Sequence, residues 1–138
     1  MNVKLLLLPL SAALFLGCAS NKLNNTVWYN ITMMEENGVV CNVGTSLFFD
    51  TDSTVAVYKG VAIDTTTVIP PFVFAHGKYW VGKKAGRDMN VTLTATKRDG
   101  MPLTYHGVYN KKNKMMLMSV PDSRLKETYF WNPKAKTK

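Results

Sequence analysis

The sequence predicts an all-β protein, a small antiparallel up-and-down barrel of about eight strands. Three observations lead to this fold class: short runs in which apolar and polar residues alternate, turn-forming residues between those runs, and no apolar stripe of helical period. With 138 residues, the chain has room for one domain. Hairpins joined in sequence form a meander, and a meander of this size closes because closure removes its exposed edges.

The first half of the domain is expected to form two hairpins. Strands are predicted at residues 26–32, 39–42, 46–49 and 54–58. Asn37-Gly38 favours a tight turn in the first hairpin, and residues 50–53 connect the second. Residues 60–70 are ambiguous, because they are rich in β-branched side chains but end at Pro70-Pro71, which stops strand pairing.

The second half continues the same pattern. Strands are predicted at residues 72–74, 79–81, 89–96, 103–105, 115–118 and 125–131, with turns at His76-Gly77 and Asp99-Gly100. The clearest alternation is at 89–96, which directs Met89, Val91, Leu93 and Ala95 inward. Residues 132–138 are expected to form a basic, disordered tail.

The first residues indicate export. Lys4 precedes an apolar run at residues 5–16 that is too short for a membrane span and ends in small residues, as a signal peptide does. A buried N-terminal strand or helix is the alternative. Phe15-Leu16-Gly17-Cys18 resembles the lipobox of bacterial lipoproteins, with Phe15 where that family prefers Leu. The resemblance implies removal of residues 1–17, a diacylglycerol on the Cys18 thiol and an acyl chain such as palmitate on the new amino terminus.

The lipobox resemblance also implies a location and a domain organisation. Residues 18–25 would form the lipidated N-terminus and a polar tether, and residues 26–131 the barrel domain. Ala19 rather than Asp follows the cysteine, which in the enterobacterial sorting pattern implies the outer membrane. Cys41 then has no partner among the two cysteines; a Cys18–Cys41 disulfide is the alternative.

A second resemblance concerns the barrel itself. Residues 23–28, the short hairpins and the final aromatic strand are together similar to small bacterial lipocalin-like lipoproteins of the calycin group. That family begins its barrel with Gly-x-Trp; here Trp28 is present and Thr26 takes the place of the glycine. The resemblance also implies a basic residue packed across the Trp, for which Arg124 and Lys126 are candidates.

Aromatic and methionine side chains supply the candidate binding residues. Neighbours such as Tyr79 and Trp80 point to opposite faces of a strand, so one of each pair lies in the core and the other can be exposed. This predicts either an apolar pocket or a patch for a partner, against the alternative that the rings shield the outer face of the sheet. The residues expected to contact a ligand are Trp28, Phe49, Phe74, Trp80, Tyr105, Met116 and Met118.

The charge of the chain points to anionic surfaces. The formal net charge is +8, from 17 basic and 9 acidic residues. Export makes nucleic acid an unexpected partner. The basic residues concentrate in predicted turns and the tail, where they are either solvated or hold the domain against anionic lipid.

The sequence gives little support for catalysis or metal binding, so neither an enzyme nor a cofactor is expected. Most acids lie in predicted turns, and no nucleophile motif flanks His76 or His106. Two histidines without a third ligand make a weak metal site. A thioether site for Cu(I) is an alternative to core filling for Met33, Met34, Met115, Met116 and Met118.

The sequence therefore predicts a lipid-anchored envelope lipoprotein, without enzymatic activity, that binds a small apolar ligand or an envelope partner. The alternative is an interaction or structural lipoprotein with a filled barrel, such as an inhibitor or assembly factor. A cavity able to hold a ligand would favour the first function. A solid core with an exposed apolar patch would favour the second.

Overall fold

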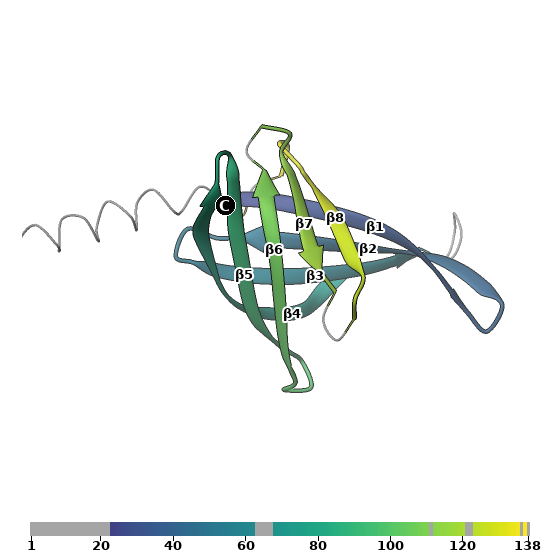
Figure 1. Cartoon of the computed structure of the whole chain (residues 1–138). Coiled ribbons are helices and arrows are strands. Elements are labelled where there is room, and N and C mark those ends of the chain that lie inside the picture. The colour runs from purple at the N-terminus through teal and green to yellow at the C-terminus, as the bar shows by residue number, and fades with distance from the viewer. Residues whose placement is uncertain (1–22, 63–67, 111, 121–122, 136, 138) are drawn as a thin grey trace, which may run out of the picture.

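The computed structural model describes residues 23–62, 68–110, 112–120, 123–135 and 137. These residues form a closed barrel of eight antiparallel strands in which each strand pairs with the next and β1 pairs with β8 (Figure 1). The predicted fold class is confirmed, and the barrel is compatible with a lipocalin-like fold. The predicted signal peptide and Cys18 lie outside the described residues.

The strands differ in length, from 5 residues in β7 to 18 residues in β4. Their bounds are β1 (Thr26–Glu36), β2 (Val39–Phe49), β3 (Thr54–Ala62), β4 (Val68–Ala85), β5 (Asp88–Lys97), β6 (Pro102–Asn110), β7 (Met115–Ser119) and β8 (Lys126–Trp131). Asn37 and Gly38 both have positive φ, at 52° and 77°, which is the geometry of the tight hairpin turn predicted there. Beyond that turn, the two short runs expected at 39–42 and 46–49 form one strand.

β4 differs most from expectation. The turn predicted at His76-Gly77 is wrong, because both residues pair with β3 on one side and β5 on the other. Gly77 allows β4 and β5 to lie close together and does not form a turn. A Cβ at this position would lie 1.9 Å from the Thr94 carbonyl oxygen. Pro70 and Pro71 also lie within β4, next to a register shift on β3 between Lys59 and Val61 that accommodates residues unable to donate.

The barrel has two distinct ends. The N-terminal end carries residues 23–25, the turns after β2, β4 and β6, and the residues after β8. Towards the opposite end, β1 and β2 lose their outer neighbours. β1 pairs with β8 only at Trp28 and Tyr29, near its start, and β2 pairs with β3 only from Asn42 onward. The β1–β2 hairpin therefore extends beyond the barrel wall (Figure 1). We call residues 31–41 the arm.

Inward-facing side chains fill the barrel between these ends. β5 follows the predicted alternation, with Met89, Val91, Leu93 and Ala95 all buried. The core also takes large side chains from the other strands, and Trp28, Phe49 and Tyr129 are the largest of those that are fully buried. Burying such rings contributes most of the hydrophobic stabilisation of a domain of this size.

Candidate functional site

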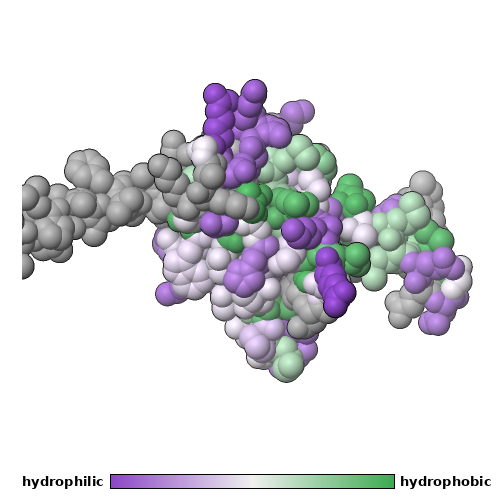
Figure 2. Space-filling view, in the orientation of Figure 1, coloured by the Kyte–Doolittle hydropathy of each residue, from purple (hydrophilic) through white to green (hydrophobic). Residues whose placement is uncertain are grey.

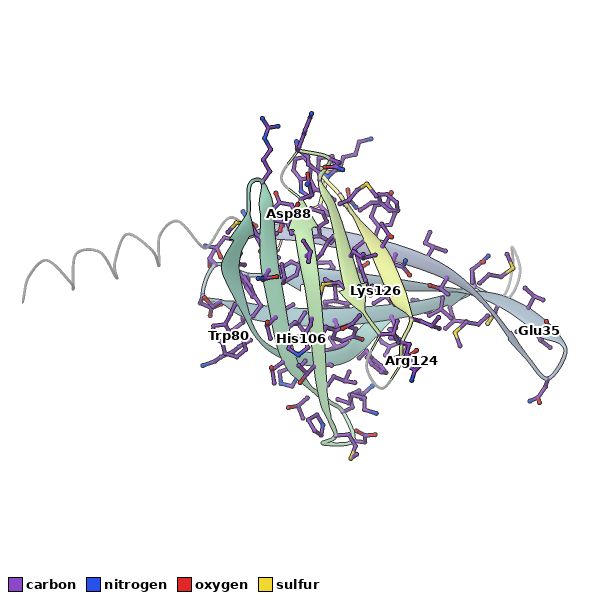
Figure 3. All side chains as sticks on the ribbon, in the orientation of Figure 1. Glu35, Trp80, Asp88, His106, Arg124 and Lys126 are labelled. Atoms are coloured by element: carbon purple, nitrogen blue, oxygen red, sulfur yellow. The ribbon has the colours of Figure 1, made fainter. Side chains whose placement is uncertain are left out.

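The barrel interior brings together six of the seven predicted ligand-contacting residues. Phe74 is partly buried and packs against one buried cluster. The other five belong to that cluster: Trp28, Phe49, Tyr105, Met116 and Met118. Trp80 does not join them. It lies on the outer wall and is 56% exposed, because it alternates with buried Tyr79 on β4 (Figure 3).

The interior residues contact one another closely. The ring of Trp28 meets Tyr109 edge-on at 5.2 Å between centroids, and Phe49 meets Tyr79 edge-on at 4.9 Å. The Trp28 indole donates to the Thr26 hydroxyl at 3.0 Å. Thr26, which stands where the lipocalin-like family has Gly, thus satisfies the polar atom of the buried Trp. These side chains bury their apolar surfaces against one another, as the side chains of a hydrophobic core do.

One pocket among the described residues, of about 140 Å³, lies beside the core and is lined by Trp28, Tyr109 and Trp131. Two others lie over the outer wall. One of about 460 Å³ lies over β2, β3 and β4 and is lined by Phe48, Tyr58 and His76. Another of about 260 Å³ lies at the base of the arm, where Gly44 and Gly60 face each other across β2 and β3. The paired glycines leave bare backbone at its floor, between Ile31 and Pro71.

A polar cluster interrupts the apolar interior. The buried Tyr129 hydroxyl donates to Glu127 Oε2 at 3.0 Å, and Thr45 also hydrogen-bonds to it. Burial, and secondarily the Glu127 carboxylate, raise the pKa of Tyr129 far above its ordinary value and raise the pKa of Tyr105 to about 12. Both phenols therefore remain neutral donors throughout the physiological range.

Tyr79 fastens the N-terminal residues to the barrel. Its hydroxyl donates to the Asn24 side chain and to the Asp50 carbonyl, the latter at 3.1 Å. Burial, followed by the charges of Asp50 and Asp52, raises the pKa of Tyr79 to about 12. Leu23 is 1% exposed and belongs to the core cluster. Residues 23–25, expected in the tether, are thus packed against the barrel.

The C-terminal residues are likewise attached at this end. Asn132 donates its backbone N–H to the Val27 carbonyl at 2.8 Å, and the Thr137 hydroxyl donates to Asn25 Oδ1 at 2.9 Å. The described part of the segment expected to be a disordered tail is therefore held beside the N-terminal residues. Both ends of the folded domain lie together.

The raised pKa values predict a loss of stability at alkaline pH. An unfolded Tyr ionises near pH 10, whereas Tyr79 and Tyr105 ionise near 12 in the folded state. Their contribution is therefore complete below pH 10 and is lost as the pH rises towards 12. Urea unfolding at a series of pH values should show the midpoint fall across this window. A midpoint that stays constant up to pH 12 would contradict the prediction.

The arm is the most apolar exposed part of the barrel. Met33 is 71% exposed and Ile31 67%, and Met34, Val39 and Val40 are each exposed by half or more. Figure 2 shows apolar side chains gathered over the arm and the adjoining wall. The patch continues across the β8–β1 seam, where Tyr29 and Phe130 lie 6.2 Å apart with Met115 beside them on β7. Cys41 has a free, partly buried thiol on this arm.

The backbone of the arm is also partly unpaired. β1 pairs with β8 at two residues only, so the part of β1 within the arm has one edge without a described partner strand. Sequence reasoning missed this feature, because strand alternation predicts a hairpin but not how far its neighbours extend. An apolar ribbon with free backbone donors and acceptors is a surface suited to pairing with an extended segment.

The basic residue that covers a Trp is not one of the two expected. Lys114 lies over the ring of Trp131, with 4.2 Å from Nζ to the ring centroid, and Trp131 pairs with Trp28 on β1. Arg124 and Lys126 are exposed near the start of β8, away from that ring (Figure 3). A register between the first and last strands was needed to find Lys114.

The two metal hypotheses gain no support from the geometry. His76 and His106 lie on β4 and β6 with β5 between them, at Thr96 and Thr92 respectively. The methionines separate into three places: Met33 and Met34 on the arm, Met116 and Met118 in the core, and Met115 on the outer face. Within the described ranges, no group of three or more His, Cys, Asp or Glu side chains could hold a metal ion.

In the part that the structure describes, no helix has the length and hydropathy needed to cross a membrane. No protein-family model, curated protein or solved structure matches this chain.

Proposed function

We propose that this protein is a lipid-anchored envelope lipoprotein that binds a partner protein through its arm and has no catalytic role. The observation that carries the proposal is the arm itself, which exposes apolar side chains on both faces and one unpaired strand edge. Solvent-exposed edges of this kind are normally protected by charges, prolines or short length. Here Glu35 and Glu36 are the only charged residues of the arm.

The packing of the interior favours a partner protein over a small apolar ligand. Five of the seven side chains expected to contact a ligand lie in one buried cluster, and Phe74 packs against it. A ligand among them would have to displace core contacts that stabilise the barrel. A partner strand added to β1 would instead satisfy free backbone groups and cover Ile31 and Met33 without any rearrangement of the core.

The proposed anchor rests on the lipobox-like segment at Cys18. It is compatible with the fold, because the chain enters the barrel at one end and the arm projects at the other. The mass of the mature protein, purified from membranes of a bacterial host, should show loss of residues 1–17 and addition of acyl groups at Cys18. An unmodified Cys18 would contradict the anchor.

A photoreactive amino acid at Ile31 tests the arm in intact cells. We expect one defined protein adduct, which disappears when Met33→Asp and Val40→Asp are introduced. Both residues lie on the same face of the hairpin and are exposed, so stability should change by less than about 0.5 kcal/mol each.

The matched control is Thr94→Asp with Thr96→Asp, two exposed residues on the outer face of β5. This variant adds the same charge and should retain the adduct. An adduct that survives in the Met33/Val40 variant would contradict arm binding. A small apolar molecule retained by the native protein in mass spectrometry would support ligand binding instead.

A further inference from the structure

The connection between the proposed anchor and the barrel is short. Leu23 is buried, and Asn24 and Asn25 are hydrogen-bonded to Tyr79 and Thr137. The described attachment to the barrel therefore begins at Leu23, only five positions after Cys18. Five residues span at most about 18 Å. An acylated Cys18 would keep the N-terminal end of the barrel within that distance of the bilayer surface.

The basic residues concentrate at this same end. Residues 83–87 form the end of β4 and the turn after it, residues 112–114 lie in the turn after β6, and residue 134 follows β8. Together they contain six of the twelve Lys and Arg residues that the structure describes, namely Lys83, Lys84, Arg87, Lys112, Lys114 and Lys134. Figure 2 shows strongly hydrophilic side chains gathered over the turns after β4 and β6. Three acids lie at this end, at Asp50, Asp52 and Asp88.

The arm has the opposite character. It carries two carboxylates and no cation, and Glu35 lies at its tip, far from Asp88 at the N-terminal end (Figure 3). Cys41 pairs with Met34, eight positions along β1 from Thr26, which corresponds to about 26 Å of strand. An anionic surface would attract the N-terminal end of the barrel and repel the arm.

We propose that the N-terminal end of the barrel docks on an anionic bilayer surface through Arg87, Lys112, Lys134 and their neighbours, and that this docking points the arm away from the membrane. The inference rests on the proposed anchor and names the surface that orients it. Each basic residue near such a surface strengthens the attraction about fivefold. The result is an arm presented to partners and not to lipid.

The free thiol of Cys41 reports this orientation in the full lipidated chain. With Cys18 alkylated by lipid, Cys41 is the one remaining thiol of the two cysteines and accepts a fluorescent donor. The protein is inserted into vesicles of phosphatidylcholine, with or without phosphatidylglycerol, that carry an acceptor on the lipid headgroup. We expect lower energy transfer on the anionic vesicles, and we expect high salt to remove the difference.

Two matched triple variants make the test specific. Arg87→Glu, Lys112→Glu and Lys134→Glu should abolish the difference between the two vesicles. Arg98→Glu, Arg124→Glu and Lys126→Glu should preserve it, although the change in net charge is identical. All six side chains are exposed, and circular dichroism should show both variants folded.

Equal transfer on both vesicles for the wild-type protein would overturn the inference, and so would an equal effect of the two variants. Both outcomes leave the anchor intact. A wild-type protein that does not enter either vesicle and has an unmodified Cys18 would instead contradict the proposed function.

Discussion

Replacing Trp28 by Ala should lower the free energy of unfolding by about 3–5 kcal/mol. Trp28 is 2% exposed and packs edge-on against Tyr109. Its indole N–H also donates to the Thr26 hydroxyl, and its backbone forms one of the two pairs that join β1 to β8. The substitution therefore leaves a large cavity beside the weakest junction of the barrel. Urea unfolding monitored by far-ultraviolet circular dichroism measures the change.

Trp80→Ala is the matched control, since it removes the same side chain from the outer wall. Trp80 is more than half exposed and makes no contribution to the core cluster. Its replacement should cost less than about 1 kcal/mol. Equal losses of stability for the two variants would contradict the placement of Trp28 in the core and of Trp80 on the outer wall.

Gly77→Ala should be the most damaging single-methyl change in the barrel, with a loss of about 3 kcal/mol or more. The new Cβ would lie 1.9 Å from the Thr94 carbonyl oxygen and 2.6 Å from the Ala95 Cα. Both obstacles are backbone atoms of β5, so no side-chain rotation relieves the overlap. β4 and β5 would have to separate at their pairing near Gly77. The same unfolding experiment quantifies the loss.

Gly82→Ala provides the comparison on the same strand. A Cβ at Gly82 meets no atom within 4 Å. This substitution should change stability by no more than about 0.5 kcal/mol. If Gly77→Ala proved as harmless as Gly82→Ala, the close approach of β4 and β5 would be refuted.

The local part of the fold could be predicted from the sequence because strands have a period of two residues. The alternation at 89–96 located β5 within one residue at each end and identified all four of its inward residues. Asn37-Gly38 identified a turn because few other residues tolerate positive φ at both positions. These features depend only on near neighbours in the chain.

The errors came from features that depend on distant segments. Gly77 was interpreted as a turn residue, whereas its lack of a side chain serves contact with Thr94 on the next strand. The arm arises because β8 reaches only two residues of β1, which no local pattern encodes. For the same reason Lys114, near in space to Trp131 but far in sequence, was not identified.

The candidate site was partly predictable in the same sense. The sequence identified aromatic and methionine side chains that share the interior, and it raised the contrast between a filled barrel and an exposed patch. It could not identify which face each residue of β1 and β2 exposes beyond the wall, because exposure there is set by where β3 and β8 end.

The two-residue seam also governs the order of folding. The pairing of Trp28 with Trp131 closes the barrel and joins residues 103 positions apart in the chain. All the hairpins between neighbouring strands can therefore form before the barrel closes. Until β8 is in place, β1 is an apolar edge along its entire length. The last strand therefore closes the barrel late, and the open sheet that precedes closure is the species expected to aggregate.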